Sequence, residues 1–142
     1  MKTVEQMLKL KPAGVIAVGP EATVLDAVRV LAEKDIGAVL VMDGPRLLGI
    51  FSERDYARKV VLKGKSSHDT PVSEIMTPAV LCVAPTDTNE QCMALMTEKR
   101  IRHLPVLANM QVVGVLSIGD LVKDIISEQK AVISELEKYI HG

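Results

Sequence analysis

The hydrophobic positions of this 142-residue chain form short runs and helical stripes in a fixed order. Apolar runs bounded by turn residues predict strands at 15–18, 38–42 and 47–51. Thr23 has the form of a helix N-cap, and the helix that follows is expected to stop near Asp35 and to bury Leu25, Val28, Leu31 and Ala32. Ser52 caps a second helix over 53–61. The order is therefore strand, helix, strand, strand, helix, preceded by a helical turn at 4–8.

The same order returns 65 positions later, because residues 15–61 align with residues 80–126 without a gap. The second half is expected to hold a turn at 72–76 and strands at 80–83, 103–107 and 112–116. A helix capped by Thr88 should bury Met93, Leu95 and Met96, with Ile101 at its exit. A last helix should begin at Ser117. Caps, prolines and turns all recur together. We infer an internal duplication, with one repeat in 1–71 and the other in 72–142, which also carries a C-terminal extension.

The last helix continues beyond the duplicated pattern. It carries an apolar stripe made of Val122, Ile125, Ile126, Val132, Ile133, Leu136 and Ile140. Two interpretations stay open: the stripe packs back over neighbouring helices, or it forms a dimer contact.

Each repeat contains the sequence Gly-apolar-apolar-Ser-x-x-Asp, ending in Ser52 and Asp55 in the first and in Ser117 and Asp120 in the second. In both, an apolar strand turns directly into a helix. The first turn of a helix has unpaired backbone N–H groups and a partial positive charge, which suits an anion. The pattern predicts either a simple helix cap or two related anion-binding sites.

The duplicated pattern resembles the cystathionine-β-synthase (CBS) domain pair, on residues 49–59 and 102–106 in particular. The resemblance implies a mixed α/β (α+β) fold in which two βαββα repeats, related by a pseudo-twofold axis, leave two clefts between them. It also implies an adenine nucleotide as ligand (AMP, ADP, ATP or NAD), a homodimer, and a regulatory, non-catalytic function exerted on an unidentified protein partner. The alternative is an interaction and dimerisation module whose clefts are vestigial.

The resemblance also assigns the site. Asp55 and Asp120 match the carboxylates that accept ribose hydroxyls, and Ser52 and Ser117 match the hydroxyls at the helix starts. The remaining candidates border adenine, reach toward phosphate or line a cleft: Ala38, Ile50, Arg54, Arg58, Thr77, Arg102, His103, Pro105, Val115 and Gly119.

The two repeats differ in basic residues, so we expect two unequal clefts. The first repeat has Gly37 and Ala38 where the second has Arg102 and His103. Arg54 lies in the first turn of its helix, where a cation opposes the helix dipole and an anionic partner would compensate it.

The composition narrows the function further. A formal net charge of −1 and three aromatic residues give no basis for nucleic-acid binding. No apolar run has the length of a membrane span, and the N-terminus lacks the pattern of a signal peptide. No Cys/His pair has metal-ligand spacing and no nucleophile–base constellation is visible, so we expect no metal and no catalysis. We expect a cytoplasmic protein in which His68 and His141 are exposed and Cys82 and Cys92 are core thiols.

Overall fold

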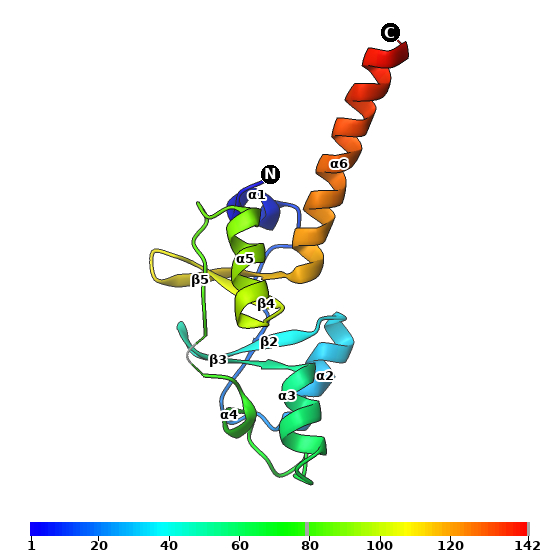
Figure 1. Cartoon of the computed structure of the whole chain (residues 1–142). Helices are drawn as coiled ribbons and strands as arrows, with labels where there is room; N and C mark the ends of the chain where they lie inside the picture. Colours follow the sequence, from blue (N-terminus) through cyan, green and yellow to red (C-terminus); the bar gives the residue numbers. More distant parts are fainter. Residues whose placement is uncertain (79, 142) are drawn as a thin grey trace. The chain divides into compact units, whose positions relative to one another are not determined.

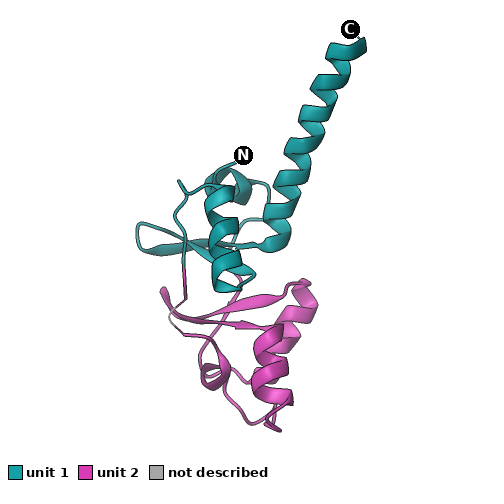
Figure 2. Cartoon of the chain, in the orientation of Figure 1, with its two compact units in different colours: residues 1–14, 82–142 teal, residues 15–81 magenta. Residues whose placement is uncertain are grey.

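The computed structural model describes residues 1–78 and 80–141, and the chain divides into two compact units. Unit 1 contains residues 1–14 and 82–142, and unit 2 contains residues 15–81 (Figure 2). The mixed α/β fold with two repeats and a long C-terminal helix, predicted from the sequence, is confirmed. The units follow a different division from the repeated sequence. Unit 2 combines the sheet of the first repeat with residues 72–81 of the second, and unit 1 combines the sheet of the second repeat with residues 1–14 of the first.

Unit 2 is a three-stranded sheet with helices packed against it (Figure 1). Its elements are β1 (Ala17–Val18), α2 (Val24–Lys34), β2 (Ala38–Asp43), β3 (Arg46–Ser52), α3 (Glu53–Asp55), the π-helix η1 (Tyr56–Val61) and α4 (Val72–Ile75). β1 pairs parallel with β2, and β2 pairs antiparallel with β3. Val72 N–H donates to the Ala22 carbonyl at 2.7 Å, which ties α4 to the start of α2.

Unit 1 repeats this arrangement on a two-stranded sheet. Its elements are α1 (Val4–Lys9), α5 (Asn89–Lys99), β4 (His103–Ala108), β5 (Gln111–Ser117) and α6 (Ile118–His141). α1 is tied to the start of α5, because Val4 N–H donates to the Asp87 carbonyl and Asn89 N–H donates to the Lys2 carbonyl. The opening segment of the chain therefore folds with the second repeat's sheet.

The two cores are built from matching positions. The core of unit 2 contains Val24, Ala27, Leu31, Val39, Val41, Phe51, Val60, Val72 and Ile75. The core of unit 1 contains Val4, Met7, Val83, Cys92, Met96, Leu104, Val106, Leu116 and Leu121. Most pairs keep the 65-residue offset, as Phe51 and Leu116 do. The duplication inferred from the sequence thus extends to the buried side chains.

The predicted caps are present as capping boxes. Thr23 pairs with Asp26, Thr88 with Gln91 and Ser52 with Asp55, each through two reciprocal side-chain–backbone hydrogen bonds. α2 ends where predicted, because its C-cap Asp35 has left-handed backbone angles (φ 52°).

Three predictions about buried faces need correction. The fully buried residues of α2 are Val24, Ala27 and Leu31. Of the predicted set Leu31 is confirmed, whereas Leu25 and Val28 are only partly buried and Ala32 is exposed. The face of α5 contains Asn89, Cys92 and Met96, with Met93 and Leu95 only partly buried. Both helices offer a second apolar set at the same spacing, so periodicity alone does not choose between them. Cys92 is buried as predicted, whereas Cys82 is partly exposed.

The strand predicted at 80–83 is reduced to a single parallel bridge between Val83 and Val106. Pro105 gives the physical reason. In unit 2 the equivalent residue, Leu40, donates its N–H to the Ile16 carbonyl at 3.4 Å and so extends the ladder. Proline has no N–H, so the same bond cannot form in unit 1.

One helix prediction changed in kind, and one of the two alternatives for α6 is excluded. The helix expected over 53–61 is α-helical only to Asp55 and continues as the π-helix η1, with Leu62 N–H donating to the Ala57 carbonyl five residues earlier. The apolar stripe of α6 does not pack back over this chain, because every described residue from 127 onward is exposed. His68 and His141 are exposed, as predicted.

Candidate functional site

The first candidate site lies where β3 turns into α3, and we call it the Asp55 cap site: Ser52, Asp55, Lys59 and Thr77. The Ser52 N–H and hydroxyl both donate to Asp55 Oδ2, at 3.0 and 3.1 Å. The Thr77 hydroxyl donates to Asp55 Oδ1 at 3.1 Å, and Lys59 Nζ lies 3.0 Å from the same oxygen. Both carboxylate oxygens are therefore engaged, and only 9% of the side chain is exposed.

Gly49 allows Thr77 to reach this site. Ile50 and Thr77 exchange two backbone hydrogen bonds, of 3.0 and 2.8 Å, which hold the segment after α4 beside β3. A Cβ at residue 49 would lie 2.8 Å from the Thr77 carbonyl oxygen and 2.6 Å from Met76 Sδ. Glycine is needed here for the close approach of two backbones, not for its backbone angles.

The second candidate site lies where β5 turns into α6, and we call it the Asp120 cap site: Lys11, Ser117 and Asp120. The Ser117 N–H and hydroxyl donate to Asp120 Oδ2, at 2.8 and 3.1 Å. Lys11 Nζ donates to the same oxygen at 2.7 Å and also to the Val115 carbonyl at 2.7 Å. The two sites therefore share the serine–aspartate box but obtain their lysine from different parts of the chain.

The two carboxylates also differ in whether an oxygen remains without a hydrogen-bond donor. All donors to Asp120 reach Oδ2, and within residues 1–78 and 80–141 no group donates to Oδ1. This oxygen is not fully buried. The Asp120 side chain is 17% exposed, about twice the value for Asp55. The Asp120 cap site therefore presents an open acceptor.

The Asp120 cap site is electrostatically connected to His103 and Arg102. Burial alone would raise the pKa of Asp120, but the hydrogen bonds from Lys11 and Ser117 outweigh it and hold the pKa below 3.8. Burial, with the nearby Lys11 cation, lowers the pKa of His103 below 6.5, and Arg102 adds to this while Asp120 opposes it. Two basic side chains, Lys11 and Arg102, thus act on the region around the carboxylate.

The structure brings most of the predicted residues close to one of the two sites. In unit 1, His103 pairs with Ser117 and Pro105 with Val115 across β4 and β5, and the Arg102 carbonyl accepts from the Ile118 N–H at 2.8 Å. Gly119 and the Arg102 side chain are exposed.

In unit 2, Ala38 pairs with Ser52 across β2 and β3, and Ile50 bridges to Thr77. Arg54 and Arg58 lie exposed on α3 and η1, and neither is among the residues bonded to Asp55.

Neither lysine was predicted from the sequence as a carboxylate partner. Lys59 lies four residues after Asp55, and this i,i+4 spacing is a visible signal. Lys11 has no local signal, because it lies 109 positions from Asp120. Only the knowledge that residues 1–14 fold with the second repeat would have pointed to it.

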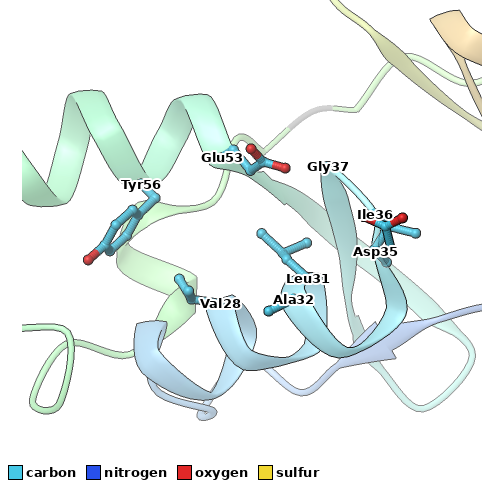
Figure 3. Close-up of a pocket in the computed structure, with 8 residues that line it drawn as sticks. All are labelled: Val28, Leu31, Ala32, Asp35, Ile36, Gly37, Glu53 and Tyr56. Carbon is cyan, nitrogen blue, oxygen red and sulfur yellow. The ribbon is translucent and has the colours of Figure 1, made fainter.

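A separate groove of about 600 Å³ lies in unit 2. It is lined by the C-terminal half of α2, by residues 35–37 and by Glu53 and Tyr56 (Figure 3). None of the predicted site residues lines it. Its walls are largely aliphatic, with the Glu53 carboxylate at one side.

No group of three or more His, Cys, Asp or Glu side chains within residues 1–78 and 80–141 is arranged to hold a metal ion. None of the described helices combines the length and apolar content needed to cross a bilayer.

Three features define a pair of CBS domains: the repeated sheets, the serine–aspartate boxes, and the way residues 1–14 and 72–81 each fold with the sheet of the other repeat. The CBS domain family model matches residues 11–62 and 72–127, so the chain belongs to the CBS-domain family. Pairs of this kind are regulatory modules that generally bind adenine nucleotides.

Related proteins agree with this assignment. A protein with CBS domains from Burkholderia ambifaria is 52% identical, with a TM-score of 0.87, over 90% of this chain and 96% of its own. A CBS-domain containing protein from Agrobacterium tumefaciens is 39% identical, with a TM-score of 0.83, over 87% of this chain and 98% of its own. The mitochondrial CBS domain-containing protein CBSX3 of Arabidopsis thaliana is 38% identical over 84% of this chain. The match spans 61% of the length of that relative.

Proposed function

We propose that this chain is a non-catalytic sensor module that binds an adenine nucleotide (AMP, ATP or NAD) first at the Asp120 cap site. The open Asp120 Oδ1 is the observation that carries the proposal. A ribose diol supplies two O–H donors, and a fixed carboxylate oxygen that is not fully buried is a matched acceptor. The low pKa of Asp120 keeps this acceptor ionised at neutral pH.

The surroundings of Asp120 favour a phosphorylated ligand. Two cations, Lys11 and Arg102, act on this region, because each of them lowers the pKa of His103. A phosphate group is stabilised by such cations and by the positive end of the α6 helix dipole. Weaker binding is expected at the Asp55 cap site, because a diol there must displace Thr77 or Lys59 from Asp55.

The second candidate function is an interaction module with vestigial ligand sites. The observation that favours it is that a lysine already neutralises each carboxylate, Lys59 at Asp55 and Lys11 at Asp120. If these ion pairs persist, neither carboxylate is free to bind a diol.

Isothermal titration calorimetry with AMP, ATP and NAD tests the choice. Asp120→Asn should weaken binding of the preferred nucleotide by about 10- to 100-fold, because a hydrogen bond to a charged group is lost. Asp55→Asn should affect only a weaker second site. Asp26→Asn is the matched control, since Asp26 occupies the same capping-box position on α2 and should leave the affinity unchanged. Absence of binding by all three nucleotides would refute the sensor function and favour the second candidate, whereas equal affinity in Asp120→Asn would refute Asp120 as the first binding site.

A further inference from the structure

The C-terminal half of α6 is an apolar surface that this chain leaves uncovered. α6 extends away from the rest of unit 1 (Figure 1), and all described residues from 127 to 141 are exposed. Large hydrophobic side chains lie along it with more than half of their surface exposed: Val132, Ile133, Leu136, Tyr139 and Ile140. Such a concentration of apolar surface on one helix indicates an interface.

The spacing of these residues is that of a coiled coil. Ile126, Ile133 and Ile140 recur every seven positions. Val122, Gln129 and Leu136 form a second series at the same interval, offset from the first by three and four positions. Two series with this relation are the a and d positions of a heptad repeat, which place both series on one seam facing a partner helix. The partner that fits is therefore another helix.

The positions that flank the seam show which helix. On one side lie Lys130 and Glu137, seven residues apart and opposite in charge; on the other lie Val132 and Tyr139, both apolar. In an antiparallel pair of identical helices, with Ile133 packed beside Leu136 of the second copy, Lys130 faces Glu137 of the second copy. By symmetry, Glu137 faces the second Lys130, and each Val132 faces a Tyr139.

We propose that α6 binds a second copy of this chain as an antiparallel two-helix coiled coil centred between residues 134 and 135. The contact matches opposite charges on one flank and apolar side chains on the other. A parallel pair would instead place Val132 against Glu137 and Ile125 against Lys130, and so would bury apolar surface beside charges on both flanks. Charge complementarity thus selects the antiparallel arrangement.

The length of the contact sets its strength. Residues 127–141 span about 22 Å at 1.5 Å per residue. A coiled coil this short is marginal in isolation, but each helix is a continuation of one that is anchored in unit 1 by the buried Leu121. We therefore expect a dimer that dissociates on dilution and weakens at high salt.

Sedimentation of the full chain over a concentration series tests this interface. Ile133→Asp should weaken dimerisation by more than about 100-fold, because it places two unpaired charges in the centre of the seam. Ser134→Asp, the matched control, adds the same charge one residue along on the outer face and should leave the dissociation constant within about threefold. Circular dichroism checks that each variant keeps its helix content.

A charge exchange tests the orientation. Lys130→Glu should weaken the dimer by roughly three- to tenfold, because two exposed ion pairs become repulsive. The double variant Lys130→Glu/Glu137→Lys should restore it, since the pairs re-form with their signs exchanged. A chain that is monomeric throughout, or a dimer unaffected by Ile133→Asp, overturns the interface. Loss of the dimer in Ile133→Asp, with no response to the charge exchange, overturns the antiparallel arrangement.

Discussion

Replacing Gly49 with alanine should damage unit 2 far more than the equivalent change at Gly114 damages unit 1. The two glycines occupy the same position in the duplicated motif, yet their neighbours differ. A Cβ at residue 49 meets the Thr77 backbone oxygen at 2.8 Å, which can move only if the segment after α4 moves. A Cβ at residue 114 meets the end of the flexible Leu8 side chain at 2.7 Å, which can rotate away.

The expected magnitude follows from these contacts. Overpacking a filled site costs about 1–3 kcal/mol. Relieving it by displacing Thr77 instead sacrifices the two backbone hydrogen bonds with Ile50, worth about 1 kcal/mol each. Alanine recovers about 0.4–1 kcal/mol by restricting the unfolded chain. We therefore expect Gly49→Ala to lower the free energy of unfolding by about 1–3 kcal/mol, and Gly114→Ala to change it by less than about 1 kcal/mol.

Two measurements separate this explanation from a general intolerance of alanine. Urea denaturation gives the change in unfolding free energy for each variant. Native-state hydrogen exchange reports directly on the Ile50 and Thr77 amides, which should lose protection in Gly49→Ala and keep it in Gly114→Ala. Equal losses of stability in the two variants, or unchanged protection of these amides in Gly49→Ala, would refute the reasoning from backbone contact.

Two further predictions concern protonation. Burial alone would raise the pKa of Asp124, but hydrogen bonds from Asn89 and Lys2 outweigh it and lower the pKa below 3.8. The stabilisation from the ionised Asp124 carboxylate is present above pH 3.8 and is lost as the pH falls through the lower pKa that this group has in the folded state. Asp124→Asn should therefore flatten the pH dependence, below pH 4, of the free energy of unfolding measured with urea. Lys11→Met should raise the pKa of His103, measured by proton NMR, because a cation that opposes its protonation is removed; an unchanged pKa would contradict the proposed proximity.

Features set by neighbours along the chain could be predicted from the sequence. The strand order and the capping boxes depend on residues within a few positions of each other, and the duplication is the recurrence of these local patterns 65 positions later. Ser52 with Asp55 is such a case, since the same three-residue spacing that indicates a cap also fixes the carboxylate at the helix start. The serine–aspartate half of each site was therefore accessible from sequence alone.

Features that depend on distant segments could not be predicted. Lys11 reaches Asp120 only because residues 1–14 fold with the second repeat, and nothing in the local pattern around Lys11 indicates that. The loss of the strand at 80–83 depends on Pro105, whose missing N–H matters only once its pairing partner is known. The sequence left open whether the stripe of α6 packs back over neighbouring helices or forms a dimer contact, because an apolar stripe does not specify what packs against it.

The inequality of the two sites has a structural origin in where each carboxylate obtains its lysine. Lys59 supplies the cation to Asp55 from the same helical segment, and the equivalent residue in the second repeat is Asp124. Asp124 is buried and bonded to Lys2 and Asn89, so it cannot play that part for Asp120. Lys11 supplies the cation from residues 1–14 instead, and it reaches Oδ2 of Asp120, which Ser117 already occupies, whereas Lys59 and Thr77 reach Oδ1 of Asp55. A duplicated box with a relocated lysine therefore leaves Oδ1 of Asp120 open while both oxygens of Asp55 are occupied, and this difference is what makes ligand binding at Asp120 the stronger expectation.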